Sequence, residues 1–270
     1  MDCYAACAVA TLVVVIPGNP GNAAFYDDFV ARLRAQGHEV LITGHPVWCT
    51  PQPGLRGYAE HQAEAVRRHL AATGRAAPEV EIVLVGHSVG AYLAHRIVAE
   101  QLLPVARVFM LFPFLRAPAP SGAVILAGLS VPPLFRAALA AVRALPASTR
   151  RRLIDLAGAG EQAALVQAAL LSDEAIACAV MASAERAEIG TRKSAAYLFE
   201  HELFRTRARF VPMLCARDRW APPALAAELG PFVYRFAAPV GHSFVVHADQ
   251  RRAVVEVLHA FLSGRDLRTG

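Results

Sequence analysis

Lysine is almost absent from this chain of 270 residues, in which Lys193 is the only lysine among 27 basic side chains. The formal net charge at pH 7 is nevertheless +5, because arginines outnumber the acidic residues. These arginines are spread along the chain. Nucleic-acid binding proteins usually gather their basic side chains into one segment or patch, and this chain does not. We therefore expect no nucleic-acid partner.

Cysteine is also scarce, and its spacing argues against two kinds of site. The five cysteines include no Cys-x-x-Cys pair: Cys3, Cys7, Cys49, Cys178 and Cys215. A disulfide scaffold needs a higher density of cysteine, and a zinc site needs closely spaced pairs. The cysteine pattern predicts a protein of a reducing cytoplasm.

Other signals are missing as well. No run of about 18 apolar residues is present, so we expect no membrane-spanning helix. Residues 1–16 are apolar, but they lack a basic start and include Asp2, so we expect no signal peptide. The sequence has no His-Glu-x-x-His, no Walker loop and no Gly-x-Gly-x-x-Gly, and we therefore expect neither a metal nor a nucleotide cofactor.

The sequence does contain short apolar runs that alternate with longer amphipathic segments. Runs rich in Val, Ile and Leu predict strands at 11–16, 39–43, 80–85, 106–112, 210–215 and 233–237. Helical periodicity predicts helices at 24–35, 58–72, 86–103, 222–229 and 250–262. This alternation is typical of an α/β protein, in which a mostly parallel central sheet has helices on both faces.

The strand signal stops between residues 117 and 206. This segment is rich in Ala and Leu and contains prolines at positions 118, 120, 132, 133 and 146. Because 270 residues are few for two full domains, we interpret the segment as a helical cap inserted into one domain. The core then consists of residues 1–116 and 207–270.

The most informative motif is Gly-x-Ser-x-Gly at Gly86, Ser88 and Gly90. It lies between a predicted strand and a predicted helix, which is the context of the nucleophile elbow in the α/β-hydrolase fold. A sharp turn here brings the flanking positions together, so a side chain at either glycine would clash with backbone. We predict that Ser88 is an exposed nucleophile; the alternative is an ordinary glycine-rich turn at the start of a helix.

A serine nucleophile needs a base and an acid, which this fold supplies after its last strands. Asp218 follows the predicted strand 210–215, and His242 follows 233–237, so both lie at the expected places. The alternatives are Asp155, the first acidic residue after position 107, which lies deep in the cap, and His247 near the last helix. We predict a triad of Ser88, His242 and Asp218.

The same chemistry needs two backbone N–H donors for the oxyanion of the reaction. Val89 follows the nucleophile and supplies one donor. The other is expected in the turn after the first strand, where Asn19 is our choice. The alternative is that Pro-Gly-Asn-Pro-Gly simply forms a good turn.

Several segments resemble the lipid droplet-associated hydrolase family. They are Ile-Pro-Gly-Asn-Pro-Gly at 16–21 with Phe25-Tyr26, Gly-His-Ser-Val-Gly-Ala-Tyr at 86–92, Leu-Phe-Pro at 111–113, Ser-Gly at 121–122, Asp-Arg-Trp at 218–220 and His-Ser-Phe at 242–244. The resemblance spans most of the chain, and segment 117–206 is its weakest part. It implies hydrolysis of carboxylic esters, among them sterol or other lipid esters, and attachment to lipid droplets.

The predicted function is therefore a serine esterase or a lipase-like hydrolase that works through an acyl-enzyme. One alternative is a lipid-surface binding protein on a hydrolase scaffold with little turnover, and another is an acyl transferase or thioesterase that uses the same residues. The cap segment 122–145 is strongly apolar and carries Arg136 and Arg143. It fits either a lid over the site or a peripheral contact with a lipid surface.

Overall fold

The computed structural model of this protein describes residues 10–48, 54–76, 79–156, 159–199, 210–216, 218–230, 233–236, 240–265 and 267. Within these residues, six strands form one sheet in the order β2-β1-β3-β4-β5-β6. Every neighbouring pair of strands is parallel. The strands are β1 (Ala10–Ile16), β2 (Glu39–Ile42), β3 (Val80–His87), β4 (Val105–Leu111), β5 (Phe210–Leu214) and β6 (Tyr234–Arg235).

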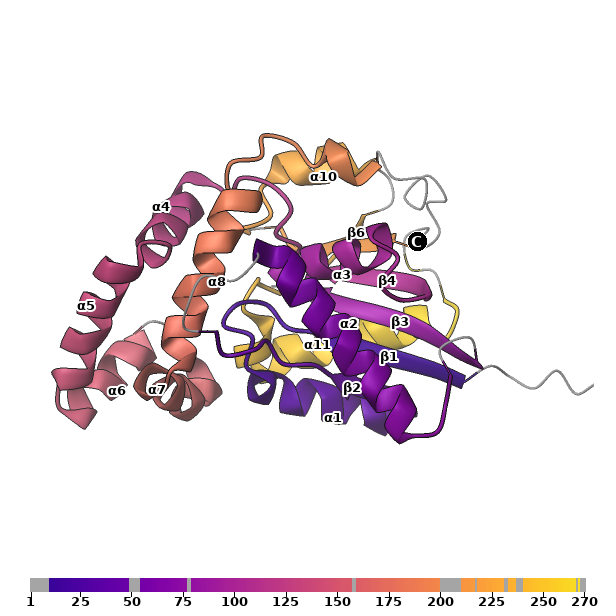
Figure 1. The fold of residues 1–270 in the computed structure, drawn as a ribbon, viewed down its shortest axis with the longest axis horizontal. Helices are drawn as coiled ribbons and strands as arrows, with labels where there is room; N and C mark the ends of the chain where they lie inside the picture. The colour runs from indigo at the N-terminus through magenta and orange to yellow at the C-terminus, as the bar shows by residue number, and fades with distance from the viewer. Residues whose placement is uncertain are drawn as a thin grey trace, which may run out of the picture.

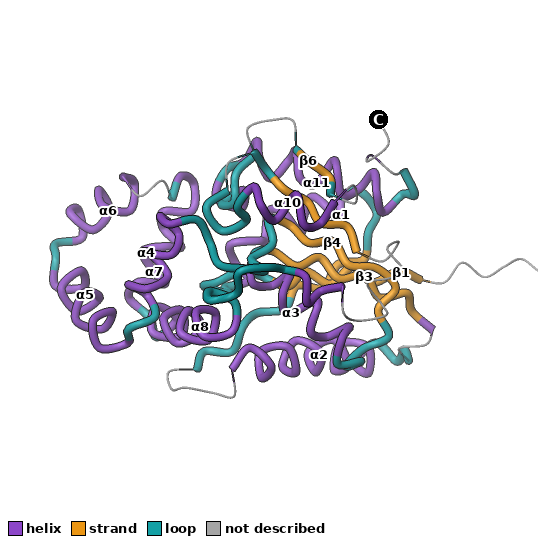
Figure 2. The backbone as a smooth tube through the Cα atoms, turned by 90° about the horizontal axis from the view of Figure 1, so that it is seen from above, coloured by secondary structure: helices purple, strands orange, loops and turns teal. Residues whose placement is uncertain are grey.

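Helices cover both faces of the sheet, and the alternation of apolar side chains in the strands explains how (Figures 1 and 2). In β1, Leu12, Val14 and Ile16 face one hydrophobic cluster, whereas Val13 and Val15 face the other. The helices of the first cluster are α2 (Gly54–Ala72), α3 (Val89–Ala99) and α10 (Pro223–Leu229). Those of the second are α1 (Asp27–Ala35), which follows a 3-10 turn at Ala23–Tyr26, and α11 (Ala248–Leu262).

The helix predicted at 58–72 begins earlier, at Gly54. The N–H of Leu55 donates to Oε1 of Glu188 at 2.6 Å, and these two residues are 133 positions apart. A side chain from the segment between β4 and β5 therefore satisfies a backbone donor that the helix start leaves free. The helix predicted to reach residue 103 ends at Ala99, shortly before Gln101, which has a φ of 54°.

Among the described residues between β4 and β5, five α-helices form a separate layer beside the sheet (Figure 1). They are α4 (Pro120–Leu129), α5 (Pro132–Ala144), α6 (Ala147–Leu156), α7 (Ala163–Leu171) and α8 (Glu174–Glu188). Helix α8 packs against α2 of the core on one side and against α4, α5 and α7 on the other. It thus joins the outer helices to the core, and Leu126 of α4 and Leu165 of α7 also pack against the core clusters.

No single helix in the described part of the chain has both the length and the apolarity needed to cross a membrane. Two pairs of helices reach that length together, each with a sharp bend at a short break: α4 with α5 at 83°, and α7 with α8 at 87°.

Candidate active site

Ser88 occupies the turn between β3 and α3 and has an unusual backbone conformation, with φ 55° and ψ −121°. The two glycines of the motif make this turn sterically possible. A Cβ atom on Gly86 would lie 2.5 Å from the carbonyl oxygen of Gly90, and one on Gly90 would lie 2.3 Å from that of Ile16. Strain of this kind at a non-glycine residue is typical of functional sites.

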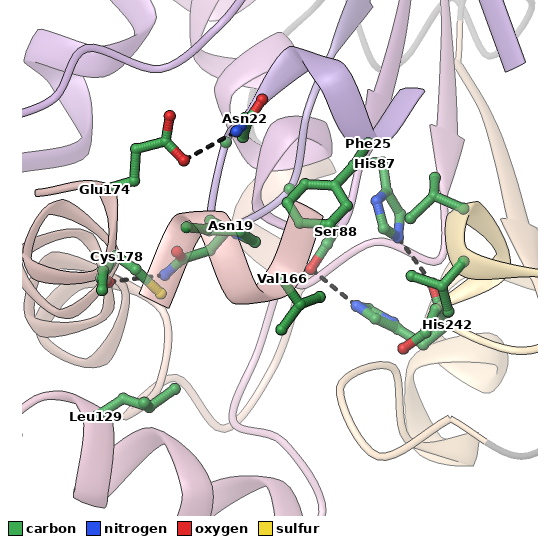
Figure 3. Close-up of a pocket in the computed structure, with 18 of the residues that line it drawn as sticks. Asn19, Asn22, Phe25, His87, Ser88, Leu129, Val166, Glu174, Cys178 and His242 are labelled. Atoms are coloured by element: carbon green, nitrogen blue, oxygen red, sulfur yellow. Dashed lines mark hydrogen bonds between the residues drawn. The ribbon is translucent and has the colours of Figure 1, made fainter. Parts of the chain in front are cut away.

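The side chains of Ser88, His242 and Asp218 form a continuous chain of hydrogen bonds. Ser88 Oγ lies 2.9 Å from His242 Nε2, and His242 Nδ1 lies 2.9 Å from Asp218 Oδ2 (Figure 3 shows the first pair). Ser88 and His242 are 154 positions apart in sequence. They meet because the carboxyl ends of parallel strands lie at one edge of the sheet.

Asp218 is well suited to hold a charge, although its side chain is fully buried. Burial by itself raises the pKa of this carboxyl, but the hydrogen bond and the positive charge of His242 outweigh it. The backbone N–H of Trp220 also donates to Oδ1 at 2.8 Å. The net result is a pKa below the usual range, so Asp218 is ionised at neutral pH.

The two alternatives considered from the sequence lie elsewhere. Asp155 is on α6 and forms a half-exposed ion pair with Arg151 at 3.0 Å. His247 is exposed at the start of α11. The structure therefore brings together Asp218 and His242, and neither alternative, with Ser88.

The turn after β1 lies against Ser88, where the predicted oxyanion site is expected. A Cβ atom on Gly18 would be 3.0 Å from that of Ser88, so only glycine allows this approach without displacement. The N–H of Gly18 itself donates to the hydroxyl of Tyr26 at 2.9 Å, which leaves Asn19 as the next backbone donor. Val89 begins α3, and the first N–H groups of a helix have no partner within it.

A buried histidine, His87, links this turn to the segment that carries His242. Tyr26 Oη lies 2.6 Å from His87 Nδ1, and His87 Nε2 lies 2.9 Å from the carbonyl oxygen of His242 (Figure 3 shows the second pair). Burial, assisted by the charge of His242, lowers the pKa of His87 to about 3, so the ring is neutral. Because a carbonyl only accepts, Nε2 carries the proton, and Tyr26 donates to Nδ1.

Ser88 and His242 open onto a cavity of about 450 Å³ that extends from these two residues to helices α4, α5, α7 and α8. Most of its wall is apolar and comes from the core as well as the cap: Phe25, Phe114, Leu126, Leu129, Phe135, Val166 and Leu170. A cavity of this size and lining suits a small apolar ligand or part of a larger one.

The turn after β1 also forms hydrogen bonds with α8. Asn19 Nδ2 donates to the carbonyl oxygen of Cys178 at 3.0 Å, and Asn22 Nδ2 donates to Glu174 Oε2 at 2.8 Å (Figure 3). Both acceptors belong to α8. The position of α8 therefore influences the backbone of Asn19.

Sequence reasoning did not assign a role to His87, Tyr26 or Glu185, although all three are buried around the cavity. His87 stands inside the Gly-x-Ser-x-Gly motif, and a polar residue there could have drawn attention to it. Glu185 offers no such signal, because a glutamate followed by Arg186 in an Ala-rich helix looks like a surface residue.

We compared the sequence and the structure of this chain with those of known proteins. A family model described as lipid-droplet associated hydrolase matches residues 9–261. The chain belongs to this family. The lipid droplet-associated hydrolase of Mus musculus is 31% identical over an aligned region that covers 38% of this chain and 37% of the mouse protein. The chain thus matches little more than a third of the length of that curated relative.

Solved structures share the fold at low sequence identity. The enol-lactonase from Burkholderia xenovorans LB400 has a TM-score of 0.60 at 17% identity and covers 94% of this chain and 92% of its own. The haloalkane dehalogenase DatA from Agrobacterium tumefaciens C58 has a TM-score of 0.63 at 16% identity, with coverages of 94% and 89%. These similarities confirm the predicted α/β-hydrolase fold.

Proposed function

We propose that this protein is a serine hydrolase that cleaves carboxylic esters through an acyl-enzyme. The single observation that carries the proposal is the pair of 2.9 Å contacts from Ser88 through His242 to Asp218 at the mouth of an apolar cavity. Membership of the lipid-droplet associated hydrolase family supports the same reaction class.

In the first half of the reaction, Ser88 Oγ attacks the ester carbonyl carbon while His242 Nε2 takes the hydroxyl proton. Asp218 accepts the hydrogen bond from His242 Nδ1 and stabilises the imidazolium that forms. The backbone N–H groups of Asn19 and Val89 hold the oxyanion. His242 then gives its proton to the departing alcohol, which leaves Ser88 acylated.

In the second half, water attacks the acyl-enzyme, and His242 acts again as the base. The proton passes to Ser88 Oγ as the acid is released. His87 and Tyr26 support both halves, because they connect the turn of Asn19 to the backbone of His242. We assign them a positioning role.

A fluorophosphonate probe tests the proposal, because it labels only an activated serine. We expect wild-type protein to be labelled, and Ser88→Ala and His242→Ala to lose the label. Ser243→Ala is the matched control, since Ser243 lines the same cavity and should not react. A folded wild-type protein that is not labelled would overturn the enzyme proposal.

We also propose that residues 117–206 act as a cap that covers the cavity and contacts a lipid surface from the cytoplasmic side. The outer helices expose large apolar side chains, among them Val124 at 73%, Leu134 at 66% and Leu156 at 84% exposure. Arg136 and Arg152 lie on the same outer helices and are exposed. Apolar side chains combined with arginine favour a surface with anionic headgroups.

Flotation with triolein emulsions coated with phosphatidylcholine and phosphatidylserine tests the lipid contact. We expect wild-type protein to float, and Val124→Asp with Leu134→Asp to remain in the soluble fraction. Val47→Asp is the control, because Val47 is 51% exposed but lies outside the cap. Equal flotation of the cap variant and the wild type would refute the contact and leave the esterase proposal untouched.

A further inference from the structure

Glu185 on α8 is a buried carboxyl group that the proposed reaction does not use. Glu185 is only 5% exposed, and it lines the same cavity as Ser88. Its Oε1 atom has no hydrogen-bond partner among the described residues. Because an unpaired buried polar atom is costly, such an atom in the wall of a ligand cavity suggests a partner that the ligand supplies.

Asn19 presents a second unpaired atom beside it. The Asn19 side chain interacts with the Glu185 carboxyl, and its Nδ2 donates to the carbonyl oxygen of Cys178. Its Oδ1 is buried without a partner in the described part of the chain. Cys178 and Glu185 are seven positions apart on α8, so they share one face of the helix. Two unpaired oxygen atoms thus lie along this face.

Glu174, another carboxyl group of α8, shows what distinguishes Glu185. Glu174 lines the same cavity, but it accepts a hydrogen bond from Asn22 at 2.8 Å. Burial raises the pKa of Glu185 to about 8, and the interaction with Asn19 only partly opposes this. The titratable groups that interact with Glu185 are Tyr58 of α2 and Cys178, and neither carries a positive charge. Glu185 is therefore a neutral acid at pH 7.

The two atoms together define the ligand group that fits. Asn19 Oδ1 only accepts, whereas a neutral carboxyl group both donates and accepts, so a ligand group placed between them can accept from Glu185 and donate to Asn19. A hydroxyl group meets both requirements. A ketone has no hydrogen to donate to Asn19, and an ammonium group would need an ionised Glu185 in a buried position.

The cavity beyond Asn19 suits the acyl part of the ester. His242 must reach the oxygen of the departing alcohol, so the alcohol leaves on the side of His242. His242 also borders a second cavity of about 360 Å³, whose wall includes Arg219, His247 and Gln250, and we assign this cavity to the departing alcohol. The apolar cavity on the side of α8 then remains for the acyl chain.

We propose that the side chains of Glu185 and Asn19 form a hydrogen-bonding subsite for a hydroxyl group on the acyl chain, and that the preferred substrates are esters of hydroxy fatty acids. This inference rests on the proposed esterase function and specifies the substrate class of the same site. A site built to hydrogen-bond a hydroxyl group discriminates strongly against analogues that lack it.

The test compares ethyl octanoate with the ethyl esters of its monohydroxy isomers, followed by titration of the released acid at pH 7. We expect at least one isomer to exceed ethyl octanoate in kcat/KM by about tenfold or more. Glu185→Met should lower this ratio by about tenfold, and Glu185→Gln should retain it, because an amide still donates and accepts. Glu174→Gln is the matched control and should leave the ratio within about twofold.

The outcomes separate the two proposals. Hydrolysis of ethyl octanoate without preference for any hydroxy isomer would overturn the subsite and leave the esterase intact. The subsite would also be overturned if Glu174→Gln lowered the ratio as much as Glu185→Met. Failure to hydrolyse any ester, together with the absence of labelling at Ser88, would overturn both. The wild-type comparison decides the question even if Glu185→Met does not fold.

Discussion

Glu185→Gln should make the protein more stable at alkaline pH, by an amount that follows from the burial of the carboxyl group. The pKa of Glu185 is raised from 4.5 to about 8 in the folded chain. Between these values the unfolded chain has lost the proton while the folded chain keeps it, so the stability of the wild type falls as pH rises. The loss ends above about pH 8, where both states are ionised.

Glutamine does not ionise, so the stability of the variant does not fall with pH for this reason. At about 1.4 kcal/mol for each pH unit, its advantage over the wild type should grow by on the order of 4 kcal/mol between pH 5 and pH 8. Tyr58 and Cys178, which interact with Glu185, do not titrate in this range because burial raises the pKa of each.

Urea unfolding followed by tryptophan fluorescence at several pH values measures this difference, since the chain contains two tryptophans. Subtracting the wild-type curve from the variant curve cancels the titration of groups common to both, including the buried histidines. A difference that is the same at pH 5 and pH 8 would refute the reasoning, because it would mean that Glu185 ionises as easily in the folded chain as in water.

Three further predictions concern the site. Gly90→Ala places a Cβ atom 2.3 Å from a backbone oxygen and should lower the free energy of unfolding by about 3 kcal/mol or more. Gly128→Ala, which has open space around it, should be neutral or slightly stabilising, and thermal unfolding compares the two variants. Tyr26→Phe removes the hydroxyl group that joins Gly18 to His87. This variant should lower kcat by about tenfold with little change in KM, as measured by initial-rate kinetics on a short-chain ester. Asp218→Asn should lower kcat by about 10³-fold to 10⁴-fold, and a reactive phosphonate should still label Ser88, but at a lower rate. An unchanged kcat would exclude Asp218 as the acid of the triad.

The sequence predicted the nucleophile turn with little help from distant contacts. Ser88 lies where a strand signal gives way to a helix signal, and the clash distances around Gly86 and Gly90 give the reason for both glycines. Asp218 and His242 were predicted from their order after later strands. The structure brings both side chains close to Ser88, because every parallel strand has its carboxyl end at the same edge of the sheet.

The start of α2 was predicted less well, because its cause is not local. Glu188 reaches Leu55 from 133 positions away, and no pattern near Gly54 reports that contact. Of the predicted strand 233–237, Tyr234–Arg235 is a strand that pairs with β5, Val233 and Phe236 are not in the strand, and residue 237 lies outside the described residues.

By itself, the sequence determined the alternation of strands and helices and the turn at Ser88, and it predicted the order of serine, acid and base, because each depends on local periodicity or on spacing along the chain. Only the tertiary structure decided which side chains surround the reaction. The contact of His87 with the backbone of His242 and the burial of Glu185 against Asn19 join residues more than 150 positions apart. Burial and pairing are properties of such contacts, and a residue type alone does not encode them.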